Sequence, residues 1–308
     1  MIEQLKKINF PVSPIFDNKK VAVAINLFNR LEGFEQYAEH LNRCDELENV
    51  PIIIFIDGGY KSKQKELIEK CKLIKHKYKY VIRRSDNYGC ERGFINIFNT
   101  ILCDLSFDYM FFIEDDIIVG KNCFEHLYTT FKQLKMNEPN LAIYQGYSFC
   151  IMDLEQKKKL LHEVEEAKVE HNIGMWGFIM DRSSWIEIRN VLSKYEAICN
   201  TLPTNGTSHM AMITTHRKQV IEAFNEIVEK YNLQENQLVK EKFYKKENEH
   251  CTVSIDGAMA LALIAASKKR YKPVVNRVLN VGDTGAHFTK EIFKNLKLDQ
   301  MTLDEVWL

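Results

Sequence analysis

The sequence lacks the signals that would place it in several large classes of protein. Lys+Arg and Asp+Glu both number 42 in its 308 residues, so the formal net charge is zero and nothing global indicates a nucleic-acid partner. The first residues, MIEQLKKINFPVSPIF, contain no long apolar run, which argues against a cleaved signal peptide or a membrane anchor. We therefore expect no transmembrane segment and a cytoplasmic location, with recruitment to the inner membrane by a partner as an alternative.

The eight cysteines form no C-x-x-C pair, so the local spacing that is typical of a zinc site is absent. Free, buried thiols in a reducing compartment are the simplest interpretation. The sequence also contains no internal repeat and no low-complexity linker. We therefore expect residues 1–308 to form a single compact domain with a sizeable core.

The first half alternates short apolar runs with stretches that have apolar residues at helical spacing. Strands are predicted within residues 19–30, 49–59, 79–93 and 107–116. Helices are predicted at residues 31–44, 62–74 and 94–105. This alternation indicates βαβ units, and hence an α/β, Rossmann-like fold with a mostly parallel central sheet flanked by helices.

The second half is less regular. Residues 140–149 read as a further strand, and residues 222–250 as one long polar helix with a solvated face, or alternatively as a mobile lid. An apolar helix is predicted at 252–270, followed by a strand and a glycine-rich loop within 274–289. We expect a helical C-terminal elaboration that includes an insertion at about residues 190–250.

Polar clusters follow three of the predicted strands, where parallel sheets bind their ligands. They are Asn29 with Arg30, Asp57 with Gly58, and Glu114 with Asp115 and Asp116. The last cluster has two interpretations, which the residues alone leave open. Its carboxylates suit a hard cation such as Mg²⁺ or Mn²⁺. Alternatively, they could cap the helix predicted in NCFEHLYTTF.

Two further residues are candidates for chemistry. His287, in the glycine-rich GDTGAH, is a candidate second metal ligand, and we rank it above His209 and His216 because it follows a predicted strand. Asp256 precedes an apolar helix. It can be the N-cap of that helix, next to the permissive Gly257, or a general base that deprotonates a hydroxyl group.

Several of these motifs occur in an order that resembles a known family. VAVAINLFNR, IIIFIDGG, RRSDNYGCERG, FFIEDDIIV and PVVNRVLNVGDTGAHFT together resemble nucleotide-sugar glycosyltransferases of the GT-A fold. The N-acetylglucosaminyltransferase-I-like group, whose acidic motif is also Glu-Asp-Asp, is the most similar. The resemblance covers residues 20–125 well, and residues 170–190 and 252–289 more loosely.

The resemblance implies a role for each candidate residue. In the family, the ends of the first three strands contact the base, the ribose and the phosphates, the first two acidic residues contact the ribose and the sugar, and a Trp-Gly segment shapes the sugar pocket. The corresponding residues are Asn29, Arg30, Asp57, Arg84, Asn87, Arg92, Glu114, Asp115, Trp176 and Gly177. A Mn²⁺ or Mg²⁺ ion would be held by Asp116, with His287 as the second candidate ligand, and Asp256 would be the base.

The chain also departs from the Golgi members of the family. Their catalytic Asp lies in a Trp-Asp-Asp segment, whereas Asp256 lies in SIDGAM, and their N-terminal membrane anchor has no counterpart here. The motif SDNYG after the third strand is closer to bacterial sugar transferases. These differences indicate a bacterial-type cytoplasmic enzyme.

The expected activity is metal-dependent transfer of a sugar from a nucleotide diphosphate sugar, most simply a UDP-sugar, to a hydroxyl group of a glycan, lipid-linked or protein acceptor, with inversion. Residues 19–125 would bind the donor and residues 126–308 the acceptor. One alternative is a nucleotidyltransferase that makes the nucleotide sugar, although the first loop, INLFNRLEGF, has only Gly33 to grip a triphosphate. The other is a non-catalytic protein that binds nucleotide sugars.

Overall fold

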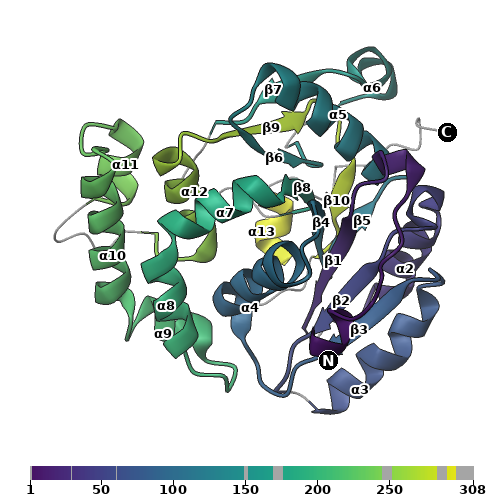
Figure 1. Cartoon of the computed structure of the whole chain (residues 1–308), viewed down its shortest axis with the longest axis horizontal. Helices are drawn as coiled ribbons and strands as arrows, with labels where there is room; N and C mark the ends of the chain where they lie inside the picture. The colour runs from purple at the N-terminus through teal and green to yellow at the C-terminus, as the bar shows by residue number, and fades with distance from the viewer. Residues whose placement is uncertain are drawn as a thin grey trace.

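A computed structural model describes residues 2–28, 30–59, 61–148, 152–168, 176–244, 252–282 and 290–295. An eight-stranded, mostly parallel sheet lies at its centre with helices on both faces, which confirms the α/β, Rossmann-like prediction (Figure 1). The sheet order is β3-β2-β1-β4-β8-β6-β9-β7. Its strands are β1 (Val21–Leu27), β2 (Ile52–Ile56), β3 (Lys79–Arg83), β4 (Tyr109–Glu114), β6 (Leu141–Gln145), β7 (Val164–Glu166), β8 (Phe178–Asp181) and β9 (Lys269–Pro273).

The four strands predicted in the first half form a continuous parallel block. β1 pairs in parallel with both β2 and β4, and β2 pairs in parallel with β3. Strand β8 runs against β4 and β6, and β7 runs against β9, so six strands share one direction and two oppose it. The carboxyl ends of β1 to β4 therefore meet at one edge.

A second, two-stranded sheet sits beside that edge. Strand β5 (Ile117–Val119) follows the end of β4 after a two-residue turn, and it pairs antiparallel with β10 (Val278–Asn280). Ile117 faces Asn280 in this pairing. The pairing brings a segment from late in the chain to the end of β4.

Alternation along the strands divides the core into two parts. In β1, Ala22 and Ala24 face one layer, and Val21, Val23 and Ile25 face the other, because successive strand residues point to opposite sides. The first layer contains α4 (Gly89–Phe98), the π-helical segment η4 (Asn99–Asp104), α7 (Arg182–Val191), α8 (Ser193–Thr201), α9 (Ser208–Ile213), α10 (Arg217–Lys230), α11 (Gln237–Lys242) and α12 (Ile255–Ala265). The second contains α2 (Phe34–Asn42), α3 (Lys61–Lys70) and α5 (Cys123–Asn137).

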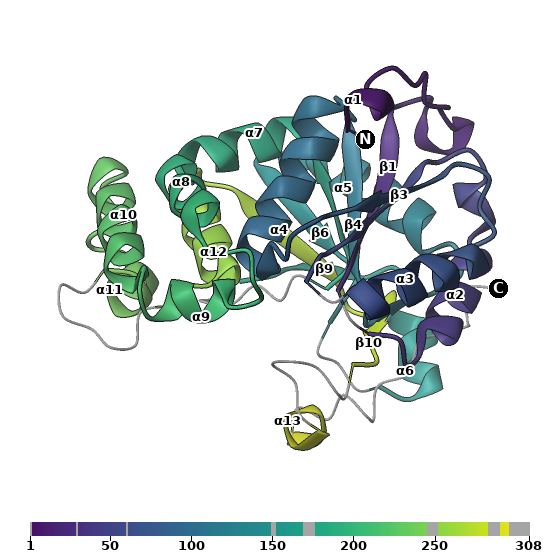
Figure 2. The same ribbon diagram turned by 90° about the horizontal axis from the view of Figure 1, so that it is seen from below.

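The described residues also form the short α-helices α1 (Ile2–Leu5), α6 (Leu154–Leu160) and α13 (Lys290–Asn295), and the 3₁₀ helices η1 (Pro14–Phe16), η2 (Asp45–Leu47) and η3 (Cys71–Leu73). The first core layer draws residues from both predicted halves of the chain, from Ala22 in β1 to Ala262 in α12. Figures 1 and 2 place α8 to α11 on one side of the sheet, beyond α7 and on the opposite side from α2 and α3.

The prediction of one long, solvated helix at 222–250 is wrong over the residues that the structure describes. Helix α10 ends at Lys230, and Asn232 adopts a left-handed conformation with φ of 53°. Helix α11 then starts after Asn236, whose side chain accepts a hydrogen bond from the Val239 N–H at 3.1 Å. The apolar side of α10 is buried in the core, and the polar residues of the segment lie on its outer face.

Other boundaries also differ from the sequence prediction. Helix α4 begins at Gly89, five residues before the start of the helix predicted at 94–105. The helix predicted at 252–270 ends at Ala265, and its last residues belong to β9. Strands β7 and β9 were not predicted because VEE and KRYKP are polar; β7 is the edge strand of the sheet, and β9 lies between β6 and β7.

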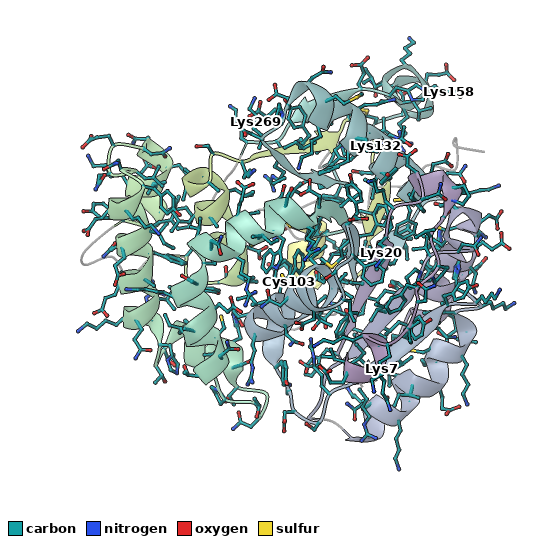
Figure 3. The ribbon with its side chains drawn as sticks, in the orientation of Figure 1. Lys7, Lys20, Cys103, Lys132, Lys158 and Lys269 are labelled. Carbon is teal, nitrogen blue, oxygen red and sulfur yellow. The ribbon has the colours of Figure 1, made fainter. Side chains whose placement is uncertain are left out.

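Positive charge on the surface is spread out and locally balanced. Figure 3 labels lysines on separate parts of the chain, Lys7, Lys20, Lys132, Lys158 and Lys269. Lys158 pairs with Glu155 at 2.9 Å, and Lys269 pairs with Glu138 at 2.9 Å. Among the described residues, no helix has both the length and the apolar character needed to cross a bilayer.

If α10 is part of the main core, truncating its inner face will be costly. Phe224 is fully buried and packs against Tyr195 and Phe243, with ring centroids 5.8 and 6.0 Å away. We expect Phe224→Ala to lower the free energy of unfolding by about 3–5 kcal/mol, measured by urea denaturation. Lys218→Ala, on the exposed side of the same helix, should change it by less than about 0.5 kcal/mol. Equal stability of the two variants would contradict the packing described here.

Candidate active site at the carboxyl edge of the sheet

The polar residues that follow β1, β2 and β4 gather at the shared edge of the sheet. Arg30, beyond β1, lies against the acidic turn that follows β4. Its guanidinium contacts the Asp116 carboxylate and lies 3.7 Å from Asp115 Oδ1. The Phe28 N–H donates to Asp115 Oδ2 at 3.3 Å. The end of β1 therefore supplies both a cation and a hydrogen bond to the two aspartates.

The acidic residues do not cap a helix, so that alternative is wrong. Glu114 ends β4, and Asp115 and Asp116 form the turn into β5. Helix α5 begins only at Cys123, after Asn122. The carboxylates thus belong to the strand end.

The late segment that ends β10 encloses the side chain of Asp116. The Asn280 side-chain amide donates to Asp116 Oδ2 at 3.2 Å, and the Val281 N–H donates to the Asp116 carbonyl at 2.8 Å. A Cβ atom at Gly282 would lie 2.6 Å from Asp116 Oδ2 and 2.3 Å from Nη1 of Arg30, so only glycine fits there without displacing them. These residues were not predicted as part of the site.

Burial and mutual repulsion raise the pKa values of the acidic turn. Burial, then Asp116, raises the pKa of Asp115 to about 7, against the opposing effect of Arg30. Burial also raises the pKa of Glu114 well above its ordinary value, and Asp116, Asp115 and Asp256 raise it further. At neutral pH the turn therefore carries less than three full negative charges.

Asp116 has one oxygen that fits a metal ion. The residue is 7% exposed, and its Oδ1 atom is buried without a hydrogen-bond partner among the described residues. A buried, unpaired carboxylate oxygen is costly, and a hard cation is a natural partner for it. The other oxygen is already occupied by Arg30 and Asn280. The donor set therefore fits coordination of a divalent ion through Oδ1.

Asp57 holds the loop that precedes α4. Its carboxylate accepts hydrogen bonds from the N–H groups of Gly58, Tyr88 and Gly89, at 2.9–3.1 Å, and lies 3.8 Å from the Arg84 guanidinium. The Gly89 N–H also donates to the Asn87 side chain at 2.8 Å. These bonds satisfy the first amides of α4, which explains why the helix starts at Gly89.

The two arginines that the sequence singled out near α4 have different surroundings. Arg84 is 6% exposed and donates to the Asn96 side chain at 2.9 Å and to the Gly93 carbonyl at 3.2 Å. Arg92 is partly exposed, and its guanidinium lies 4.3 Å from the centre of the Tyr88 ring. Arg84 is thus largely committed to internal contacts, whereas Arg92 retains access to solvent.

Asn87 connects this loop to the helical region. It is 3% exposed, its N–H donates to the Thr204 carbonyl at 3.1 Å, and it forms an isolated parallel bridge with Asn205. The segment between α8 and α9 is therefore in direct contact with the loop after β3.

Asp256 lies in the first turn of α12, but it is not the N-cap, so that alternative is wrong. Ser254 is the cap, and its side chain accepts from the Gly257 N–H at 3.5 Å. Oδ1 of Asp256 is buried without a hydrogen-bond partner among the described residues. Burial and then Glu91 raise the pKa of Asp256 to about 6, with Arg270 opposing them. Asp256 is also close enough to Glu114 to raise its pKa, so the two acidic groups are neighbours.

The Trp-Gly segment meets β10. Gly177 has a φ of +65°, and a Cβ atom there would lie 3.0 Å from Val278 Cγ1, so the position requires glycine. The Trp176 ring contacts the Tyr147 ring edge-on at 4.9 Å. Asn29 and His287 lie outside the described residues.

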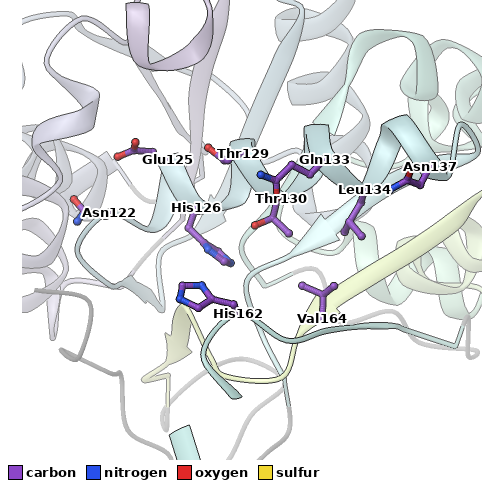
Figure 4. A pocket seen from close by; sticks show the side chains of 10 residues that line it. All are labelled: Asn122, Glu125, His126, Thr129, Thr130, Gln133, Leu134, Asn137, His162 and Val164. Carbon is purple, nitrogen blue, oxygen red and sulfur yellow. The ribbon is translucent and has the colours of Figure 1, made fainter. Parts of the chain in front are cut away.

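A cavity of about 460 Å³ lies elsewhere, along α5 (Figure 4). Its lining residues are Asn122, Glu125, His126, Thr129, Thr130, Gln133, Leu134, Asn137, His162 and Val164, and none of them is a predicted site residue. Burial lowers the pKa of His126 to about 3, and its Nε2 atom lies 3.0 Å from the Tyr144 hydroxyl. The partly buried His126 is therefore neutral at pH 7.

No protein-family model matches the chain, and no curated protein matches its sequence. Among solved structures, the mannosyltransferase PcManGT from Pyrobaculum calidifontis, in complex with GDP-Man and Mn²⁺, is 10% identical with a TM-score of 0.40, over 86% of this chain and 78% of that chain. TarS from S. aureus is 11% identical with a TM-score of 0.36, over 56% of this chain and 29% of that chain.

GalNAc-T7 with UDP, GalNAc and Mn²⁺ is 13% identical with a TM-score of 0.36, over 56% of this chain and 36% of that chain. Similarities of this size do not assign an activity to the chain. The residues themselves have to support any function.

The bonding of Asp57 predicts a structural effect of its removal. Asp57→Asn replaces one acceptor oxygen by an amide that cannot accept from the Tyr88 and Gly89 N–H groups, so we expect a loss of about 1–3 kcal/mol of unfolding free energy in urea denaturation. The exposed Asp86, in the same loop, is the matched control, and Asp86→Asn should be close to neutral. A stable Asp57→Asn protein would mean that the carboxylate does not hold the loop.

Proposed function

We propose that this protein is a metal-dependent glycosyltransferase. It would move a sugar from a nucleotide diphosphate sugar, with a UDP-sugar as the first choice, to a hydroxyl group of an acceptor, with inversion at the anomeric carbon. The observation that carries the proposal is a pair of buried carboxylate oxygens without partners, Asp116 Oδ1 and Asp256 Oδ1, in two groups that both raise the pKa of Glu114. One suits a metal ion and the other suits a base.

Asp116 would hold a Mn²⁺ or Mg²⁺ ion through Oδ1, the oxygen that has no other partner. Such an ion offsets negative charge on a diphosphate leaving group. Asn280 and the Val281 N–H keep the aspartate in place. His287 stays a proposed second ligand because an imidazole in a glycine-rich loop after a predicted strand suits a metal such as Mn²⁺, and it lies outside the described residues.

The remaining residues would bind and orient the donor. Arg92 offers a forked donor of the kind that suits phosphate oxygens, and Arg30 would lie beside the base. Glu114 and Asp115 would contact the ribose and the sugar, and their raised pKa values allow a carboxyl group to donate as well as accept a hydrogen bond.

The other expected contacts rest on the resemblance. Trp176 and Gly177 would shape the sugar pocket, and Asn29 would lie beside the base. Asp57, Arg84 and Asn87 are assigned to base, ribose and phosphates. Their bonds within the protein give them at least an additional role, which is to fix the loop and the start of α4.

Asp256 would accept the proton of the acceptor hydroxyl as that oxygen attacks the anomeric carbon. A carboxylate with a pKa of about 6 is mostly unprotonated at pH 7, and it is a stronger base than an exposed aspartate. The first turn of α12 holds it on a rigid element. A single displacement with one base accounts for the inversion.

Asp116→Asn should remove metal-dependent donor binding. UDP and GDP are the probes, and binding is followed as a rise in melting temperature with and without Mn²⁺. We expect the Mn²⁺-dependent part of the rise to disappear in Asp116→Asn. Asp108→Asn, at the opposite end of β4, should retain it. An unchanged Mn²⁺ effect in Asp116→Asn would remove this residue from the metal site.

Asp256→Asn should bind the same nucleotide as the wild type but fail to transfer sugar, because an amide cannot accept the proton. For the wild type, the rate at low substrate should rise as pH passes about 6 and then level off, since the base must be unprotonated. Nucleoside diphosphate release from a panel of UDP- and GDP-sugars with Mn²⁺ measures both. Full transfer by Asp256→Asn would sink the assignment.

The same panel separates the alternatives. Release of nucleoside diphosphate, faster with an acceptor glycan, supports a transferase. Exchange of pyrophosphate into the nucleotide sugar would instead indicate a nucleotidyltransferase. Mn²⁺-dependent binding without turnover for every donor and acceptor tried would indicate a non-catalytic binding protein.

A further inference from the structure

Three residues with metal-binding side chains meet where α4 and α9 pack together (Figures 1 and 2). Cys90 and Glu91 lie in the first turn of α4, and His209 lies near the start of α9. One ligand atom from each lies within 4.8 Å of the other two. The contact joins positions more than a hundred residues apart, so the sequence spacing gave no sign of it.

A close approach of the two helices keeps these residues together. Gly89 has a φ of +67°, and a Cβ atom there would lie 1.8 Å from Ser208 Oγ. Only glycine lets the start of α9 sit this close to the start of α4. Ser208 is 2% exposed and precedes His209 directly. This packing holds the backbone of His209 beside the first turn of α4.

Glu91 is the unusual member of the group. It is fully buried, and its Oε1 atom lies 2.6 Å from His209 Nδ1. Its other oxygen, Oε2, is buried and has no hydrogen-bond partner among the described residues. An ionised carboxylate with one unpaired oxygen is costly to bury, and a cation would satisfy it.

The donor set is that of a borderline metal ion. A thiolate, an imidazole and a carboxylate are the three ligand types that Zn²⁺ uses in proteins. Two ligand atoms on a tetrahedral Zn²⁺, with bonds of about 2.0–2.3 Å, lie about 3.3–3.8 Å apart. Cys90 Sγ and His209 Nδ1 are 3.7 Å apart, close to that separation. The Glu91 carboxylate would have to move away from Nδ1 to the metal.

We propose that Cys90, Glu91 and His209 form a binding site for a divalent ion of the Zn²⁺ class, separate from the ion proposed for Asp116. Binding would release the thiol proton of Cys90, and His209 would coordinate through Nδ1 with its proton on Nε2. The three protein ligands leave a fourth position for water or a substrate atom, as in zinc sites that act on substrates. Asp256 and Glu114 both lie close enough to interact electrostatically with Cys90, so the site adjoins the proposed active site.

Cobalt is the probe, because a thiolate bound to Co²⁺ gives a charge-transfer absorption band in the near ultraviolet. We expect the purified full-length chain to develop this band with one equivalent of Co²⁺, and Zn²⁺ to displace the Co²⁺ and abolish it. Cys90→Ser should lose the band, and His209→Ala should weaken Co²⁺ binding by more than about 100-fold, since loss of a ligand exceeds the effect of an outer-shell change.

Two controls make the result specific. Cys103→Ser, about 20 Å further along the same helical run, should keep the band (Figure 3). Asp116→Asn should also keep it, which separates this site from the one in the proposed function. Melting curves check that each variant is folded, and His209→Gln serves as a second variant at that position. No band in the wild type, or a band that survives Cys90→Ser in a folded protein, would overturn the proposal.

Discussion

The arrangement of the site depends on the balance of charge at the end of β4. Three consecutive carboxylates occur there, Glu114 at the end of a mostly buried strand and Asp115 and Asp116 in the turn after it, and they would be strongly unfavourable without partners. Arg30 supplies the nearest cation, and the Phe28 N–H and the Asn280 side-chain amide donate hydrogen bonds to the carboxylates of Asp115 and Asp116. Raised pKa values in Glu114 and Asp115 reduce the remaining charge. The pairing of β1 with β4 and of β10 with β5 brings these groups to the carboxylates, and without them the acidic turn would be strongly destabilising.

Much of the fold could be predicted because parallel strands that are buried on both faces have continuous apolar sequences. VAVAINL, IIIFI and YMFFIE can hardly be anything else once helices separate them, and a parallel sheet then fixes which ends share an edge. The polar strands β7 and β9 carry no such signal. The end of α10 was also not predicted, because the helix is interrupted by the left-handed conformation of Asn232 while the residues around it favour a helix.

The site was predictable in part for the same reason. Asp57, Asp115 and Asp116 follow strands, so their positions come with the sheet. Helix-cap interpretations of Asp116 and Asp256 failed because a cap depends on where the helix begins, and that varies by several residues on local bonding. No local sequence pattern identifies Gly282, Glu91 or His209 as site residues. Contacts between distant segments bring Gly282 to Asp116 and bring His209 to Glu91.

The bridge between Asn87 and the segment joining α8 to α9 bears on how far the chain can be shortened. Residues 190–250 match no recognisable motif and could be taken for a dispensable appendage. However, the Thr204 carbonyl accepts a hydrogen bond from the Asn87 N–H, and Ser208 packs against Gly89. This segment therefore supports one side of the loop before α4, and Asp57 holds the other side through its hydrogen bonds. Removing residues 190–244 would delete the contacts of Thr204 and Ser208 with that loop and leave the hydrogen bonds of Asp57 to hold it. The part of the molecule with the least familiar sequence is therefore scaffolding for its most recognisable part.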